Sequence, residues 1–277
     1  MRVHVQPWVT AALFTAGVHG ILPAATPAAQ PYAGHWQVRQ VLLDETRTDR
    51  FLYQVNDPRL VGRMVVIDER QIESDLPEAS ACAQPVLTPE PHVLNTLLQQ
   101  TMLPAVSGQD AAHAFGLNVP GTREVKVAWI ACTTGQFGPS LKGVAAAAAR
   151  QGKPGRSWLA LAAPHQLLVR WYGDTVLLLE PTSPDQPASP SFSCGQARWP
   201  AERAICASPR LASYDLSLAK AWGAAVQACE GDAACLNQAR RAQKQWVGQR
   251  NRCEQDEACL RKAMTSRLNA LMAPAED

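Results

Sequence analysis

Charged side chains are scarce in this sequence, and the two signs nearly cancel. Only 18% of the 277 residues are Asp, Glu, Lys or Arg, and 26 basic residues against 24 acidic ones leave a net charge of +2. Proteins built to hold nucleic acid carry a large positive excess, so this charge argues against nucleic acid as a partner. Hydrophobic residues make up 47%, which excludes a wholly disordered chain and allows one or two packed domains.

The sequence also lacks a hydrophobic run of the ~20 residues that a membrane-spanning helix needs. The nearest candidate, residues 9–22, is interrupted by glycines and ends before Pro23. Arg2 precedes this run and small residues follow it, which is the order of a secretory signal peptide. We predict a signal peptide over residues 1–29, cleaved near Ala28 or Ala29, and a periplasmic or secreted protein without a membrane span. A buried first strand or an anchor is the alternative.

Histidine is absent beyond His165, where six of the eight cysteines lie, so a mixed Cys/His zinc site is excluded there. These six cysteines form three close pairs along the chain, with separations of 12, 6 and 6 residues. In an exported protein disulfides are the better account, and an all-thiolate zinc site is the alternative. We predict no metal and no cofactor. The predicted disulfides are Cys194–Cys206, Cys229–Cys235, Cys253–Cys259 and, by elimination, Cys82–Cys132.

A proline-rich stretch, residues 182–191, divides the chain into two parts and is typical of an extended linker. Residues 31–181 show strand-like alternation, most clearly over 124–130. Residues 166–172 and 175–180 flank Gly173-Asp174, which predicts a tight hairpin. A helical stripe over 92–102 interrupts the strands. We predict an antiparallel β-barrel or sandwich for this part.

The tail, residues 192–273, has helical periodicity instead, and we predict three helices in it. A segment around Cys229 and Cys235 is echoed around Cys253 and Cys259, and in both copies an aspartate precedes the second cysteine. We expect Asp232 and Asp256 to cap helices at these two corners. The whole chain is therefore predicted to be α+β, with a disulfide-stapled three-helix domain after the β domain. The apolar stripes are Leu211, Tyr214, Leu218, Trp222 and Ala225; Cys235, Ala239, Ala242 and Trp246; and Leu260, Met264, Leu268 and Leu271.

In residues 192–272 the six cysteines occur in a fixed spacing with seven other residues: Ala197, Glu202, Ile205, Asp215, Trp246, Arg250 and Asn251. By this pattern the segment resembles the lysozyme inhibitor family named after the mycobacterial lipoprotein LprI. Departures from the family pattern are Tyr214, where leucine is usual, and Met264, where an aromatic residue is common. In the β part, Gly34-His35-Trp36 is similar to the opening of lipocalin-like barrels.

The resemblance implies an exported protein that inhibits lysozyme, or binds another envelope or host protein, by protein–protein contact. Residues 191–277 carry 12 Lys and Arg against 9 Asp and Glu, so the tail does not attract a cationic lysozyme over long range. The cleft of lysozyme holds two catalytic carboxylates, which a basic side chain could contact. We take Trp199 as an exposed aromatic contact. The candidate basic contacts are Arg198, Arg203 and Arg210.

The family-pattern charges Glu202 and Arg250 are predicted to serve the fold, as an ion pair or a helix cap with a surface charge. Trp222 and Trp246 lie on apolar stripes and are predicted to be core residues.

The sequence favours binding over catalysis. Ser217-Leu-Ala-Lys220 satisfies the Ser-x-x-Lys motif of penicillin-binding enzymes, but the companion motifs are absent from the sequence. We predict a protein that is not an enzyme. The alternatives are small-ligand binding by the β domain and an unrecognised envelope hydrolase, and the oligomeric state stays open.

Overall fold

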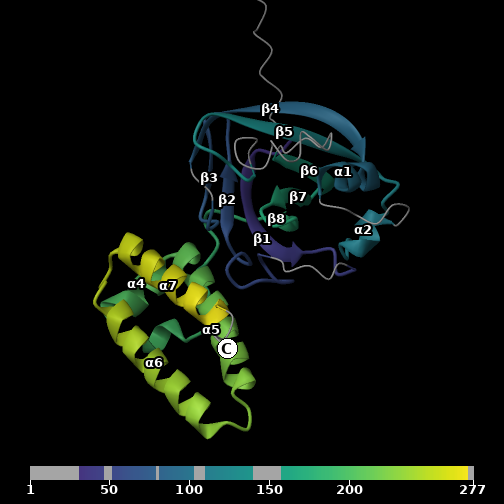
Figure 1. Cartoon of the computed structure of the whole chain (residues 1–277). Coiled ribbons are helices and arrows are strands. Elements are labelled where there is room, and N and C mark those ends of the chain that lie inside the picture. The colour runs from purple at the N-terminus through teal and green to yellow at the C-terminus, as the bar shows by residue number, and fades with distance from the viewer. Residues whose placement is uncertain (1–30, 47–51, 79–80, 103–109, 140–156, 274–277) are drawn as a thin grey trace, which may run out of the picture. The chain divides into compact units, whose positions relative to one another are not determined.

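Eight antiparallel strands form a closed barrel in sequence order, with β8 paired to β1 (Figure 1). The computed structural model describes residues 31–46, 52–78, 81–102, 110–139 and 157–273, so the predicted signal peptide lies outside the described residues. Of the two predicted β architectures, the barrel is the one observed. The strands are β1 (Gly34–Leu42), β2 (Met64–Ile67), β3 (Gln71–Ser74), β4 (Cys82–Val93), β5 (Glu124–Thr134), β6 (Trp158–Ala163), β7 (Gln166–Trp171) and β8 (Thr175–Pro181).

The barrel interior is filled by apolar side chains. Successive residues of a strand point to opposite faces, and in β7 this places Leu167, Val169 and Trp171 in one core cluster and Leu168 in another. The first cluster, which also contains Trp36 and Phe137, is the interior. An eight-stranded barrel is just wide enough for side chains to fill it.

Part of the outer face is covered by the two short helices α1 (Leu94–Thr101) and α2 (Ala111–Ala114). Helix α1 lies within the range predicted from periodicity, and its leucines are buried as expected. The indole of Trp158 in β6 donates a hydrogen bond to the Thr101 hydroxyl at 3.0 Å, which ties the end of this helix to the sheet.

One hairpin turn and one strand show how the local sequence determines structure. The predicted hairpin is present, and Gly173 and Asp174 both have positive φ, 64° and 55°, as a two-residue hairpin turn requires. Strand β4 escaped prediction because it contains Pro85, Pro89 and Pro91. Proline cannot donate to a ladder and is confined to positions that need no N–H. Strand β4 pairs with β5 along most of its length but with β3 at only two positions, so its other edge is largely open.

The tail is helical as predicted, with its three long helices in the expected places. A short helix, α4, precedes them and was not predicted, because eight residues are too few to show a periodic stripe. Pro200 at its first position and Glu202 in its first turn define its start. The helices are α4 (Pro200–Ala207), α5 (Pro209–Ala228), α6 (Ala233–Asn251) and α7 (Glu257–Met272), preceded by the 3₁₀ turn η1 (Cys194–Gln196).

Both predicted aspartate caps are confirmed. The Asp232 carboxylate accepts hydrogen bonds from the backbone N–H of Ala234 and Cys235, and Asp256 accepts one from Cys259. All four predicted disulfides are formed, so the cysteines are not zinc ligands.

A polar contact joins α5 to the chain that leads into β2. The Arg63 guanidinium is fully buried, donates to the Ser217 hydroxyl at 3.0 Å and stacks 3.4 Å from the centre of the Tyr214 ring. The Ser213 hydroxyl donates to the Gly62 carbonyl at 2.7 Å. Gly62 has φ +83°, and a Cβ there would clash with the Ser213 hydroxyl, so only glycine allows this approach.

Candidate protein-contact site

Trp199 lies on an exposed turn that a disulfide closes. The Cys194–Cys206 bridge spans this turn, which leads directly into α4 at Pro200. The Trp199 side chain is 56% exposed, as predicted. Large aromatic side chains are usually buried, so an exposed tryptophan on a cross-linked turn is a candidate contact residue.

The Glu202 carboxylate holds the backbone of this turn. One of its oxygens accepts hydrogen bonds from the N–H groups of Arg198, at 2.8 Å, and Trp199, at 3.1 Å. Partial burial alone would raise the pKa of Glu202, but the two N–H donors together with the positive charges of Arg250 and Arg198 hold the pKa below its usual value. The Arg203 guanidinium donates to the Arg198 carbonyl at 2.8 Å, so two of the three predicted basic contacts lie together at the turn.

Behind the turn, Glu202 also lies beside Arg250, with which an ion pair was predicted. Arg250 of α6 is buried and lies 3.8 Å from the other Glu202 oxygen. The Asn251 side-chain oxygen accepts from the same guanidinium at 2.8 Å, and the Trp246 ring centre lies 5.7 Å away. Burial lowers the pKa of Arg250. Trp222 and Trp246 were predicted to be core residues, but both are only half-buried, and the Trp246 indole donates to the Ala263 carbonyl.

Ile205, Asp215 and Ala197, which the sequence analysis also named, make contacts within the tail or with the linker that precedes it. Ile205 is fully buried in the helical core. Asp215 in α5 accepts hydrogen bonds from the backbone N–H and the hydroxyl of Ser191, at 2.7 and 2.6 Å. This contact fixes the end of the predicted linker, which forms no helix or strand. Ala197 is half-buried at the end of η1.

Arg210, the third predicted basic contact, has a different environment. It lines a groove together with Asp75 and Tyr214 and does not share the contacts of the Trp199 turn. The sequence-based grouping of the three arginines is therefore not reproduced as one surface.

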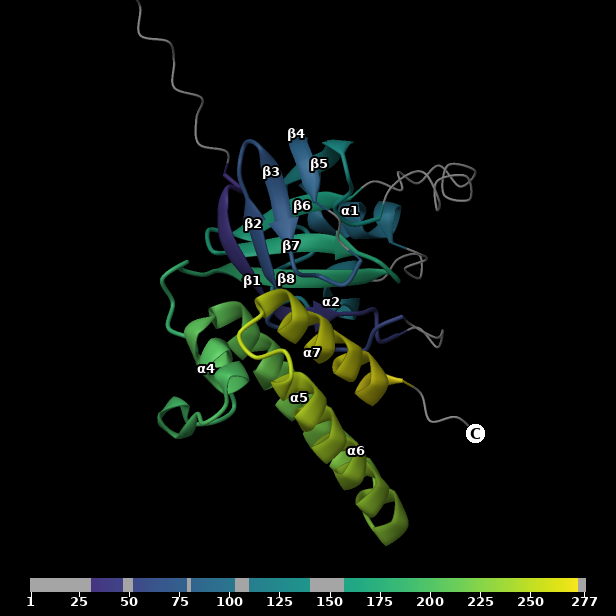
Figure 2. The ribbon, with the colours of Figure 1, turned by 90° about the vertical axis from the view of Figure 1, so that its left-hand side faces the viewer.

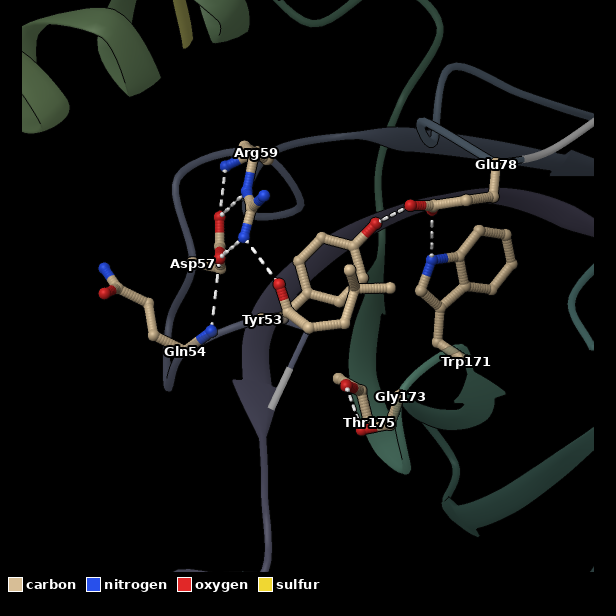
Figure 3. A network of polar contacts seen from close by, with 9 residues as sticks. Tyr53, Gln54, Asp57, Arg59, Glu78, Trp171, Gly173 and Thr175 are labelled. Carbon is tan, nitrogen blue, oxygen red and sulfur yellow. Dashed lines mark hydrogen bonds and ion pairs between the residues drawn. The ribbon is translucent and has the colours of Figure 1, made fainter. Parts of the chain in front are cut away.

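The structure also contains a polar cluster that no sequence pattern indicated, which includes the buried Tyr53 and Trp171 of the interior cluster (Figure 3). The Tyr53 hydroxyl donates to Glu78, whose other oxygen accepts from the Trp171 indole at 3.1 Å. Burial, followed by the Glu78 carboxylate, raises the pKa of Tyr53. Arg59 lies over the Tyr53 ring and pairs with Asp57 at 2.7 Å. Residues so far apart in sequence give no local signal of such a cluster.

The arrangement of this cluster suits structural roles. Every polar atom discussed in it has a partner, and none of the residues is a serine, cysteine or histidine positioned as a nucleophile or base. The Ser217 hydroxyl of the Ser-x-x-Lys motif is buried and bound to Val61, Ser213 and Arg63. In the described part of the chain, no group of three or more His, Cys, Asp and Glu residues could hold a metal ion.

Comparison with models of protein families, with curated proteins and with solved structures finds no match for this chain. Among the described residues, no helix is both long enough and apolar enough to cross a membrane. Four disulfides fit an extracellular or periplasmic location, since such bonds persist in oxidising compartments.

Proposed function

We propose that this chain is an exported binding protein that acts by protein–protein contact through the Trp199 turn, and that its partner is a lysozyme. The exposed Trp199 side chain on a cross-linked turn is the observation that carries the proposal. The resemblance of the tail to the LprI-like inhibitor family supplies the partner class.

The turn has the physical properties of a preorganised contact. The disulfide and the two hydrogen bonds to Glu202 restrict the backbone before any partner arrives, which lowers the entropy cost of binding. Arg198 and Arg203 are exposed beside Trp199. A tryptophan flanked by two arginines suits a cleft that has apolar walls and carboxylates, as the cleft of lysozyme has.

The filled barrel interior argues against the alternative of small-ligand binding inside the β domain, since a binding barrel needs an apolar cavity. The barrel then serves as a rigid partner for the helices.

A lysozyme turbidity assay with the oxidised full-length protein tests the proposal. We expect inhibition by the unaltered protein and a loss of at least about tenfold in inhibitory potency for Trp199→Ala, because contact tryptophans often contribute ~2 kcal/mol or more. Val86→Ala is the matched control, since Val86 is 60% exposed on strand β4.

Two results would contradict the proposal. If the protein inhibits none of several types of lysozyme, lysozyme is not its partner. If the unaltered protein and Trp199→Ala inhibit equally, the Trp199 turn is not the contact, even if lysozyme binds elsewhere on the protein. A competition experiment between the protein and an oligosaccharide bound in the lysozyme cleft then tests whether the turn enters the cleft: displacement of one by the other indicates that it does.

A further inference from the structure

A groove of about 680 Å³ lies between the chain that follows β3 and the helices α5 and α7. The segment from Glu73 to Pro77 forms one side, and Arg210 and Tyr214 of α5 also line it. The other side is one face of α7, because its lining residues recur at spacings of three and four. These α7 residues include Ala258, Arg261, Lys262, Thr265 and Asn269.

The groove carries more positive than negative charge. Four basic residues line it, Arg59, Arg210, Arg261 and Lys262, against the two carboxylates of Glu73 and Asp75. Arg59 is already paired with a carboxylate, that of Asp57. Within the described ranges Arg261 and Lys262 have neither an ion pair nor a hydrogen bond, so their charges are available to a ligand.

Neutral polar groups lie beside these charges. The side chains of Thr265, Ser266 and Asn269 make no hydrogen bond to any residue that the structure describes, so they can donate to and accept from a ligand. Among the described lining residues the only aromatic ring is that of Tyr214, which is 4% exposed and has the Arg63 guanidinium over one of its faces. A sugar ring therefore finds no stacking surface here, whereas a peptide backbone finds hydrogen-bonding partners.

We propose that this groove binds an extended acidic peptide segment of a partner protein. The lined face of α7 runs from Ala258 to Asn269, which is about 16 Å at 1.5 Å per residue. An extended peptide rises about 3.3 Å per residue, so about five residues match this length. Aspartate or glutamate side chains would pair with Arg261, Lys262 and Arg210. The site shares no residue with the Trp199 turn, so it goes beyond the proposed function and does not depend on it.

Fluorescence anisotropy with a labelled oligoglutamate peptide and the full-length oxidised protein tests the site. We expect binding that weakens with salt. The double variant Arg261→Glu/Lys262→Glu is expected to weaken it by about tenfold or more, since each lost charge-assisted contact becomes a repulsion. Arg240→Glu/Arg241→Glu changes the net charge by a similar amount on an exposed part of α6, and we expect it to weaken binding by less than about twofold.

A charge-neutral variant separates specific from general attraction. Thr265→Val/Asn269→Ala keeps the charge, and we expect about threefold weaker binding from lost hydrogen bonds. Equal weakening by the two double-glutamate variants, or no binding by the unaltered protein, would overturn the proposal. Tighter binding of an oligogalacturonate than of the peptide would overturn the peptide as ligand, and equal binding of an oligoglutamine would overturn the role of charge.

Discussion

The barrel and the helical tail are stabilised in different ways. The barrel has an interior cluster of some twenty buried residues, including four fully buried residues of β7 and β8 in direct register, and a second cluster on its outer face. The tail has a smaller cluster, and α6 contributes one buried residue, Arg250, over its nineteen positions. In Figures 1 and 2 the end of α6 near the Cys229–Cys235 corner lies away from α4 and α7.

The two parts therefore depend on different interactions for their stability. Three of the four disulfides lie in the tail, where cross-links and caps compensate for a limited apolar core. The barrel relies on packed side chains, and its one disulfide joins the buried Cys82 to the half-buried Cys132. The two candidate contact surfaces, the Trp199 turn and the α7 face with Arg261 and Lys262, both belong to the tail. Fewer of the tail's side chains are buried in a core, so more of them are exposed to partners.

Trp171→Ala is expected to have the largest effect on stability. It removes a fully buried indole from the barrel interior and leaves Glu78 without one of its donors, so we expect a loss of about 3–5 kcal/mol in the free energy of unfolding. Trp246→Ala, at a half-buried position of the tail, should cost less than half as much. Urea unfolding followed by circular dichroism measures both, and equal losses would refute the contrast between the two cores.

Removing one corner disulfide of the tail comes next. Cys253→Ser/Cys259→Ser opens a short loop, for which chain entropy predicts a loss of about 2 kcal/mol. Because Asp256 still caps α7, we expect the helix to remain and the loss to fall on the tail alone. Limited proteolysis should then cut the tail before the barrel; simultaneous cleavage of both parts would contradict this expectation.

Arg63→Met, made in the Asp75→Asn background so that no buried carboxylate loses its opposing charge, should be nearly neutral, within about 1 kcal/mol. The guanidinium is buried with two nitrogens, Nε and Nη1, that have no hydrogen-bond partner in the described chain. Replacing a buried charge by an apolar side chain of similar volume often costs little, because the desolvation penalty disappears with the charge. Arg63→Ala leaves a cavity beside Tyr214 and should cost about 2 kcal/mol. Thermal unfolding distinguishes these outcomes, and a Met variant as unstable as the Ala variant would show that the charge itself is needed.

The smallest expected effects are opposite changes of the unfolding free energy with pH, one from Asp75 beside the barrel and one from Glu202 in the tail. Burial raises the pKa of Asp75 in the folded barrel, so its contribution to stability falls as pH rises above 3.8, the ordinary value. The pKa of Glu202 is lowered by backbone N–H donors despite burial, so its contribution is lost as pH falls below 4.5. Asp75→Asn should flatten the fall in stability with rising pH, and Glu202→Gln should flatten the loss with falling pH. Unfolding free energies between about pH 3 and 6 check both signs.

Much of this fold follows from local sequence. The helical stripes of α5 and α7, the Gly173-Asp174 hairpin and the caps at Asp232 and Asp256 depend on neighbours within a few residues, which the sequence displays directly. Strand β4 and helix α4 were missed for reasons that are also local: prolines suppress the strand signal, and eight residues carry too little periodicity.

The candidate sites could be predicted from the sequence only in part. The exposure of Trp199 was predicted because it lies off every periodic stripe beside Pro200. The separation of Arg210 from Arg198 and Arg203 was not, because it depends on which side of α5 faces the chain after β3. No pattern in the sequence links Tyr53, Glu78 and Trp171.

The amino-acid sequence by itself determined the order of β and α parts, the pairing of the cysteines and the ends of the principal helices, because these depend on short-range periodicity, turns and spacing. Closure of the sheet through β1 and β8, the burial of Arg63 against Tyr214 and the gathering of basic residues along the groove were decided only in the tertiary structure. The Arg63–Ser217 hydrogen bond alone joins residues 154 positions apart, and the energies of all these features arise from contacts and desolvation that exist only once the chain has folded.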